Sequence, residues 1–265
     1  MNRQILVLLA SLMALGMTTT MADGMADDRW AAYEYTADEV NAAATRDLAL
    51  AMAPSRLAGT LNRNTPEWER VHHLFARLTE VAMQRSALAR KLDWTLYLHE
   101  GRLAEAYSRA GGKIVLSTRF LEHYRLNDAE LALVIGHEIA HALCEHERMN
   151  LSAVWRRNAP QKLEARYAME FLDTEPWVRA QIAPIARLQE RIADRIGLEL
   201  VTDAGFDPVS ALRFFDKDAE DHQSEGMFPD VHDSAGHRKA SLLRPATSFA
   251  PVFAIFRGGQ LNCSP

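Results

Sequence analysis

Apolar residues recur at helical spacing in the part of the chain that follows residue 30. Residues 31–53 are rich in alanine, which favours a helix. Thr65 followed by Pro66 is typical of a helix start, because threonine caps free N–H groups and proline suits the first helical position. Behind this start, apolar residues repeat every three or four positions, at Val71, Leu74, Phe75, Leu78 and Val81. This spacing predicts a helix that packs one face against a core.

After residue 91 the apolar residues no longer follow helical spacing, and the pattern becomes typical of strands. The stretch LDWTLYLH (92–99) has the aromatic and β-branched content of a strand. A second strand, GGKIVLS (111–117), starts with a glycine pair, and EAYS (105–108) fits a third, shorter strand between them. The pattern therefore predicts a small β-sheet before the next helix.

A capping box starts that next helix. Asn127 is suited to cap it, and Glu130, three residues later, can bond back to the cap. Since apolar residues continue behind the cap, we expect this helix to run to about Met149. A further helix is predicted at 188–200. Its apolar stripe consists of Leu188, Ile192, Ile196 and Leu200.

The helix behind Asn127 carries the sequence VIGHEIAHALCEHE (134–147). His137 and His141 are four positions apart, so both imidazoles lie on one face and can converge on one ion. Neutral imidazole nitrogens suit zinc. Glu138 lies one position round the helix, where it can reach a water on the metal and act as a general base. The alternative is an inert helix that is rich in histidine, and a third ligand should decide between the two.

Two sources of a third ligand can be compared. An extended motif with a glycine and a third histidine is excluded, because Cys144 and Glu147 occupy those positions. His146 is at the wrong offset, and we expect it to be solvated. The other source is a carboxylate from a second helix, where Glu190 and Asp194 lie one turn apart. One of these carboxylates can bind the metal while the other orients a ligating histidine; the alternative is that both form exposed ion pairs.

The first 22 residues have the pattern of a secretory signal. A short, weakly positive start precedes an apolar run at 5–16, and small residues at 20–22 suit cleavage. The run is shorter than the ~20 residues that a membrane span needs. We therefore expect the chain to be exported and cleaved; a buried N-terminal helix or an uncleaved anchor is the alternative.

The composition of the chain limits which partners it can bind and bears on the cellular compartment in which it works. With 265 residues, 48% hydrophobic and 25% charged, the chain is typical of a globular domain of moderate size. The formal net charge of -5 and the absence of a basic run argue against nucleic acid as a partner. Cys144 and Cys263 are the two cysteines, and in an oxidising compartment they can form a disulfide. The alternative is a buried Cys144 and a free thiol in the tail.

The order of these features resembles a known family over roughly residues 60–245. A strand pair, the HExxH motif at 137–141, the ExxxD motif at 190–194 and the stretch DAGFDP follow one another. This order resembles the gluzincin zinc metallopeptidases that include the CAAX prenyl endopeptidase and HtpX. Within them, the chain is most similar to the soluble, exported bacterial branch of BepA and LoiP.

This resemblance implies a role for each polar residue of the two motifs. His137, His141 and Glu190 would bind one zinc ion per chain. Glu138 would be the general base, and Asp194 would support a ligand from behind. The roles agree with those that the spacing allows.

Members of the family also tend to carry a histidine and an arginine six residues apart near the end of the domain. His232 and Arg238 have this interval here, although Asp233 replaces the usual proline. The resemblance implies a catalytic role for His232, either as a ligand that blocks the resting site or as a donor to the transition state. Arg238 would support it. The alternative is a loop histidine without a role in the chemistry, with His222 and His237 as rival candidates.

The resemblance further implies a mostly helical α+β fold, in which a zincin-like metallopeptidase domain has a small β-sheet beside the active-site helix. We expect GGKIVLS to form the edge strand that faces the cleft, a central position being the alternative. The expected segments are a signal peptide (1–22), an N-terminal helical segment (23–60), the zinc metallopeptidase domain (61–245) and a C-terminal tail (246–265).

The predicted function is that of a zinc-dependent endopeptidase in the periplasm. The resemblance implies unfolded or misassembled envelope proteins as its substrates, and peripheral association with the membrane is a further option. The alternative is a zinc-containing holdase of the envelope, which would bind such chains without cutting them.

Overall fold

The computed structural model describes residues 33–158, 162–220, 233–243 and 260–263. The chain divides into two units, Met1–Ala32 and Tyr33–Pro265, and all the described residues belong to the second. The predicted signal peptide and His232 lie outside the described residues.

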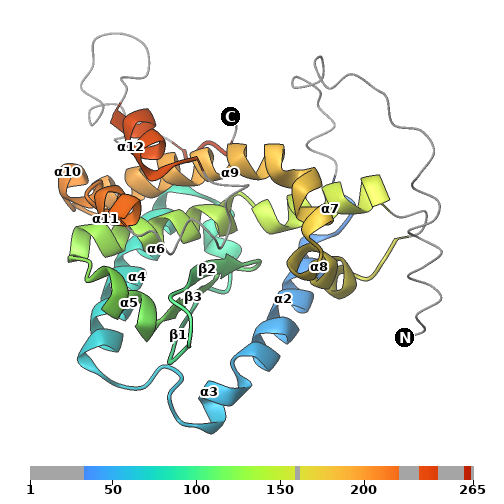
Figure 1. The fold of residues 1–265 in the computed structure, drawn as a ribbon, viewed down its shortest axis with the longest axis horizontal. Coiled ribbons are helices and arrows are strands. Elements are labelled where there is room, and N and C mark those ends of the chain that lie inside the picture. Colours follow the sequence, from blue (N-terminus) through green and yellow to red (C-terminus); the bar gives the residue numbers. More distant parts are fainter. Residues whose placement is uncertain (1–32, 159–161, 221–232, 244–259, 264–265) are drawn as a thin grey trace. The chain divides into compact units, whose positions relative to one another are not determined.

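Helices make up most of the described chain, and a small sheet accompanies them (Figure 1). The helices are α2 (Ala37–Ala51), α3 (Ala53–Leu57), α4 (Pro66–Arg85), α5 (Thr118–Tyr124), α6 (Asp128–Leu143), α7 (His146–Asn158), α8 (Ala165–Thr174), α9 (Pro176–Asp203), α10 (Pro208–Ala211), α11 (Phe214–Glu220) and α12 (Ala235–Leu243), with a 3-10 turn at Ala89–Lys91. None of the helices in the described ranges has the length and apolar character needed to cross a membrane. The prediction of a mostly helical α+β fold is confirmed.

The predicted starts of two helices are confirmed by their caps. Thr65 accepts a hydrogen bond from the N–H of Trp68 at 3.2 Å, which starts α4 at Pro66. Asn127 and Glu130 bond to each other's backbone N–H at the start of α6, at 3.0 and 2.7 Å. These local bonds satisfy N–H groups that a helix start leaves unpaired.

The sheet contains β1 (Thr95–His99), β2 (Ala106–Arg109) and β3 (Lys113–Ser117) in the order β1-β3-β2. β3 is parallel to β1 and antiparallel to β2. The prediction that GGKIVLS forms the edge is therefore wrong, because β3 lies in the centre. All five residues of β3 are buried, as expected for a strand that is covered on both faces.

The two outer strands of the sheet differ in what covers them. Asn62 bonds along β1: its side chain accepts from the Leu98 N–H at 2.8 Å and donates to the Leu96 carbonyl at 3.1 Å. β2 is the opposite edge, and it contacts α6. The edge that faces the predicted active-site helix is therefore β2, the stretch predicted as the short third strand.

α6 is buried along most of its length, where it packs against α4, α9 and β2 (Figure 1). A helix that is apolar on nearly every side belongs in the core. Polar side chains on such a helix need partners inside the protein, because an unpaired polar group loses its bonds to water. His137 and His141 stand on this helix.

Two glycines allow α6 and α9 to cross in backbone contact. A Cβ atom on Gly197 of α9 would lie 2.8 Å from the backbone nitrogen of His137, and one on Gly136 of α6 would lie 3.0 Å from the Gly197 carbonyl oxygen. No larger residue fits at either position unless the helices separate. The crossing holds Glu190 and Asp194 of α9 opposite the histidines of α6.

Gly197→Ala is expected to lower the free energy of unfolding by about 1 to 3 kcal/mol, because the added methyl group meets backbone atoms that cannot turn aside. Urea denaturation measures the change. Gly236→Ala is the matched control, since a Cβ atom on Gly236 meets nothing within 4 Å. Equal stability of the two variants would contradict the close crossing.

The predicted helix from Asn127 to Met149 is broken, so that prediction is wrong in its end point. α6 ends at Leu143, and Glu145 takes a left-handed conformation with φ 50°. Such a conformation is uncommon for residues other than glycine, and Arg148 Nη1 stabilises it by bonding both Glu145 carboxylate oxygens at 2.9 and 3.1 Å. α7 therefore leaves in a new direction.

The C-terminal tail returns to this break. Cys144, which caps α6, is joined to Cys263 by a disulfide with the Cα atoms 5.4 Å apart. Arg195 of α9 also donates to the carbonyl of Asn262 beside it. The segment 260–263 is thus held against the helices that carry the predicted site.

Candidate metal centre and cleft

His137 and His141 of α6 and Glu190 of α9 bring three ligand atoms to one place. The Nε2 atoms of the two histidines are 3.0 Å apart. Glu190 Oε2 lies 3.1 Å from His137 Nε2, and Glu190 Oε1 lies 3.4 Å from His141 Nε2. Among the residues that the structure describes, these three side chains form the group whose donor atoms lie close enough together to hold a metal ion.

The donor set and its spacing fit zinc. Zinc bonds nitrogen and oxygen at about 2.0 to 2.2 Å in a tetrahedron, which puts neighbouring ligand atoms about 3.3 Å apart. The separations of 3.0 to 3.4 Å between these atoms match that spacing. Two imidazoles and one carboxylate also leave a fourth position open, as in catalytic zinc sites.

Asp194 of α9 orients the first histidine from behind. Its Oδ1 lies 3.0 Å from His137 Nδ1, which leaves His137 Nε2 for the ligand group. Arg238 of α12 bonds both oxygens of Asp194, with Nη2 2.6 Å from Oδ1 and Nε 2.8 Å from Oδ2. Burial opposes ionisation of Asp194, but Arg238 and then His137 hold the pKa of this carboxyl below its usual value. Asp194 therefore stays a strong acceptor for the His137 ring.

Arg238 thus reaches the site through Asp194, although α12 lies more than forty residues further along the chain than Asp194. Its guanidinium also lies over the Phe215 ring, 5.0 Å from the centroid. His232, predicted six residues before Arg238, lies outside the described residues.

Glu138 lies next to the ligand group without joining it. With His137, Asp194 and Arg238 it lines a cavity of about 1140 Å³, whose walls also include β2, α11 and α12. A carboxylate at this place can take a proton from a water at the open position of the metal.

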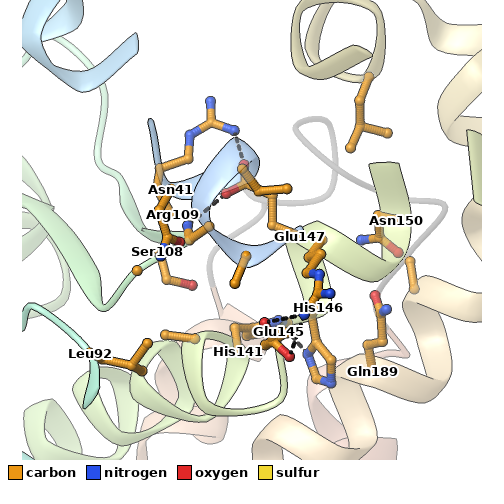
Figure 2. Close-up of a pocket in the computed structure, with 18 of the residues that line it drawn as sticks. Asn41, Leu92, Ser108, Arg109, His141, Glu145, His146, Glu147, Asn150 and Gln189 are labelled. Carbon is orange, nitrogen blue, oxygen red and sulfur yellow. Dashed lines mark hydrogen bonds and ion pairs between the residues drawn. The ribbon is translucent and has the colours of Figure 1, made fainter. Parts of the chain in front are cut away.

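A second cavity, of about 630 Å³, reaches the ligand group through His141 and Glu190 (Figure 2). Both cavities are also lined by Ser108 and Arg109 at the end of β2. The edge strand therefore borders both cavities, and it is the candidate to bind an extended chain that crosses the metal centre.

Arg109 fixes the end of this edge strand. Its Nη1 lies 2.8 Å from Glu147 of α7 and its Nη2 lies 2.7 Å from Asp173 of α8. Glu147 also accepts the Ala110 N–H at 2.6 Å. Burial raises the pKa of Glu147, although Arg109 acts in the opposite direction. Sequence spacing could not reveal this cluster, because its hydrogen-bonded pairs are 37 to 64 residues apart.

His146 is the site residue that sequence analysis misjudged. It was expected to be solvated, yet only 2% of its surface is exposed. Its Nδ1 lies 2.9 Å from Nδ1 of His141 (Figure 2). Burial, with a further contribution from His141, lowers the pKa of His146 well below its usual value, so its ring is neutral. The expectation failed because it assumed an unbroken helix.

A metal position left open beside a carboxylate, in a cleft with a strand edge, is the arrangement of a metallopeptidase. Comparison with protein families agrees, since the model described as Peptidase family M48 matches residues 66–246. The chain belongs to this family. The predictions of the metallopeptidase family and of a zinc metalloprotease are confirmed.

Two curated proteins show how far the similarity extends. The mitochondrial metalloendopeptidase OMA1 of Arabidopsis thaliana is 29% identical over 171 residues, which cover 64% of this chain and 35% of the plant protein. The "Putative beta-barrel assembly-enhancing protease" of Vibrio cholerae serotype O1 is 26% identical over 145 residues, which cover 50% of this chain and 30% of that protein. The matched regions span about a third of the length of these relatives.

Proposed function

We propose that this chain is a zinc-dependent endopeptidase of the bacterial envelope that cleaves unfolded or misassembled proteins. The observation that carries the proposal is the convergence of His137, His141 and Glu190 beside Glu138, where two cavities meet the edge strand. The signal-like pattern of residues 1–22 supports a periplasmic location. The name of the Vibrio relative, which refers to β-barrel assembly, supports envelope proteins as substrates.

The described residues can perform each protein-based step of hydrolysis. A zinc ion in this site would supply the Lewis acid that activates water and polarises the scissile carbonyl. Glu138 takes the proton of the attacking water and passes it to the leaving amine. Asp194 holds the His137 ring with Nε2 toward the ligand group, and Arg238 keeps Asp194 ionised.

The edge strand β2 supports a preference for unfolded substrates. An extended chain can add to a strand edge through backbone hydrogen bonds, which tolerate many side chains. Arg109 and its acidic partners hold the end of β2 in place before a substrate arrives. Folded proteins expose few extended segments of this kind, so they are expected to resist cleavage.

Digestion of one protein in two states tests the proposal. The zinc-loaded chain should cut a reduced, carboxymethylated disulfide protein and leave its native, disulfide-bonded form intact. A chelator should stop the reaction. No cleavage of the unfolded form would overturn the proposal, and tight binding of that form without cleavage would favour the holdase.

The mature N-terminus tests the location. Purification from the periplasm of a bacterial host and N-terminal sequencing should find a chain that starts close to residue 23. An intact N-terminus in the membrane fraction would instead support an uncleaved anchor.

Glu190→Ala is expected to lower the zinc content from about one ion per chain to a small fraction, because two imidazoles alone leave the ion without its carboxylate ligand. Metal analysis after dialysis measures the loss. Glu170→Ala is the control, since Glu170 lies on the exposed side of α8. Full zinc occupancy of Glu190→Ala would remove Glu190 from the ligand set.

A further inference from the structure

The two metal-ligand histidines of α6 have different partners behind them. His137 Nδ1 meets the carboxylate of Asp194 at 3.0 Å. His141 Nδ1 meets Nδ1 of His146 at 2.9 Å, with the two rings edge to face and their centroids 4.8 Å apart. One ligand is thus backed by a carboxylate and the other by a second imidazole.

The tautomers of both rings follow from this geometry. When His141 Nε2 binds a metal, its Nδ1 carries the proton and donates it. His146 Nδ1 must then be the acceptor, so the proton of His146 sits on its Nε2. His146 can accept this proton as a neutral imidazole, and its side chain is buried against His141, with 2% of its surface exposed.

The break between α6 and α7 creates the contact. In a straight helix, residues five apart point about 140° away from each other. The left-handed Glu145 turns the chain so that His146, the first residue of α7, lies against His141. Arg148 holds this turn through Glu145, and its Nε also donates to the Tyr35 carbonyl at 2.7 Å.

We propose that His146 is a positioning residue for the metal centre: its Nδ1 accepts the Nδ1–H of His141 and so keeps His141 Nε2 turned toward the zinc ion. The proposal rests on the zinc site of the proposed function. A neutral acceptor also orients His141 without adding another carboxylate near Glu138 and Glu190, whose charges would repel it. Loss of such a partner typically weakens metal binding by about 10- to 100-fold.

Two substitutions separate the acceptor from the bulk of the ring. His146→Phe keeps a planar ring and removes both nitrogens. His146→Asn places a carbonyl oxygen close to the position of Nδ1, so it preserves the acceptor. Zinc affinity of the metal-free proteins, measured by competition with a chromophoric chelator, should fall by about 10- to 100-fold in His146→Phe and stay within about threefold of wild type in His146→Asn.

Thermal unfolding of the metal-free variants checks that each is folded. If His146→Phe does not fold, His146→Leu removes both nitrogens with less bulk and takes its place. Wild-type zinc affinity in the variant without nitrogens would overturn the proposal, and so would an equal loss in His146→Asn. Failure of the wild-type chain to bind zinc would instead overturn the proposed function, so the two failures are distinguishable.

Discussion

Glu138→Gln is expected to lower kcat for peptide hydrolysis by on the order of 10²- to 10⁴-fold, while the zinc content stays close to that of wild type. Glutamine has the shape of glutamate but cannot accept the proton of the attacking water. Glu138 is outside the group of ligand atoms formed by His137, His141 and Glu190, so metal binding should survive. Rates of cleavage of an unfolded protein and metal analysis of the same preparation measure both effects.

Glu80→Gln is the matched control, because it makes the same change of charge on the exposed face of α4. Its rate should equal that of wild type. Zinc loss in Glu138→Gln would place Glu138 among the ligands. An unchanged rate with zinc retained would assign the base to another residue and leave the metallopeptidase class intact.

The sequence predicts those parts of the site that depend on residues close together in the chain. Asn127 and Glu130 start α6 through bonds between residues three apart. The helical period puts His137 and His141 on one face, and the need for a third ligand points to the carboxylates of 190–194. The first two steps use distances along the chain that one helix fixes. The choice of Glu190 on a second helix rests on the resemblance to the family.

The strand order could not be predicted in the same way. A continuous apolar stretch such as KIVLS is typical of a central strand, and all of β3 is indeed buried. The expectation that it faces the cleft passed over EAYS, whose four residues are all only partly buried. Contacts with α6 and the bonds of Asn62 to β1 decide which of the two outer strands faces the cleft. Those contacts join residues that are far apart in sequence.

The crossing of α6 and α9 and the position of His146 escaped prediction for a related reason. Gly136 and Gly197 are about sixty residues apart, and nothing near either glycine indicates that they touch. His146 reaches His141 only because Glu145 takes a left-handed conformation. A glutamate in the sequence does not indicate that conformation. The conformation of one residue therefore decides that His146 is a buried partner of His141, a proposed metal ligand, and not a solvated side chain.

The disulfide between Cys144 and Cys263 is expected to contribute strongly to the stability of the folded chain. It closes a loop with a sequence separation of 119 residues and ties the tail to the C-terminal end of α6, three residues after His141. In the chain-entropy model, a loop of this length stabilises the folded state by about 4 to 5 kcal/mol. Thiol labelling of the denatured, unreduced protein should find no free cysteine, and two labelled cysteines would contradict the bond.

Reduction of the wild-type chain should therefore lower its free energy of unfolding by about 4 to 5 kcal/mol in urea denaturation at constant zinc concentration. Cys263→Ala is the control, because it opens the same loop at an exposed position and leaves Cys144 in the core. The same reductant should leave its stability unchanged, at the value of the reduced wild type. If the oxidised wild type and Cys263→Ala are equally stable, the loop contributes nothing to the folded state. The tail is then held by contacts such as that of Arg195 with Asn262.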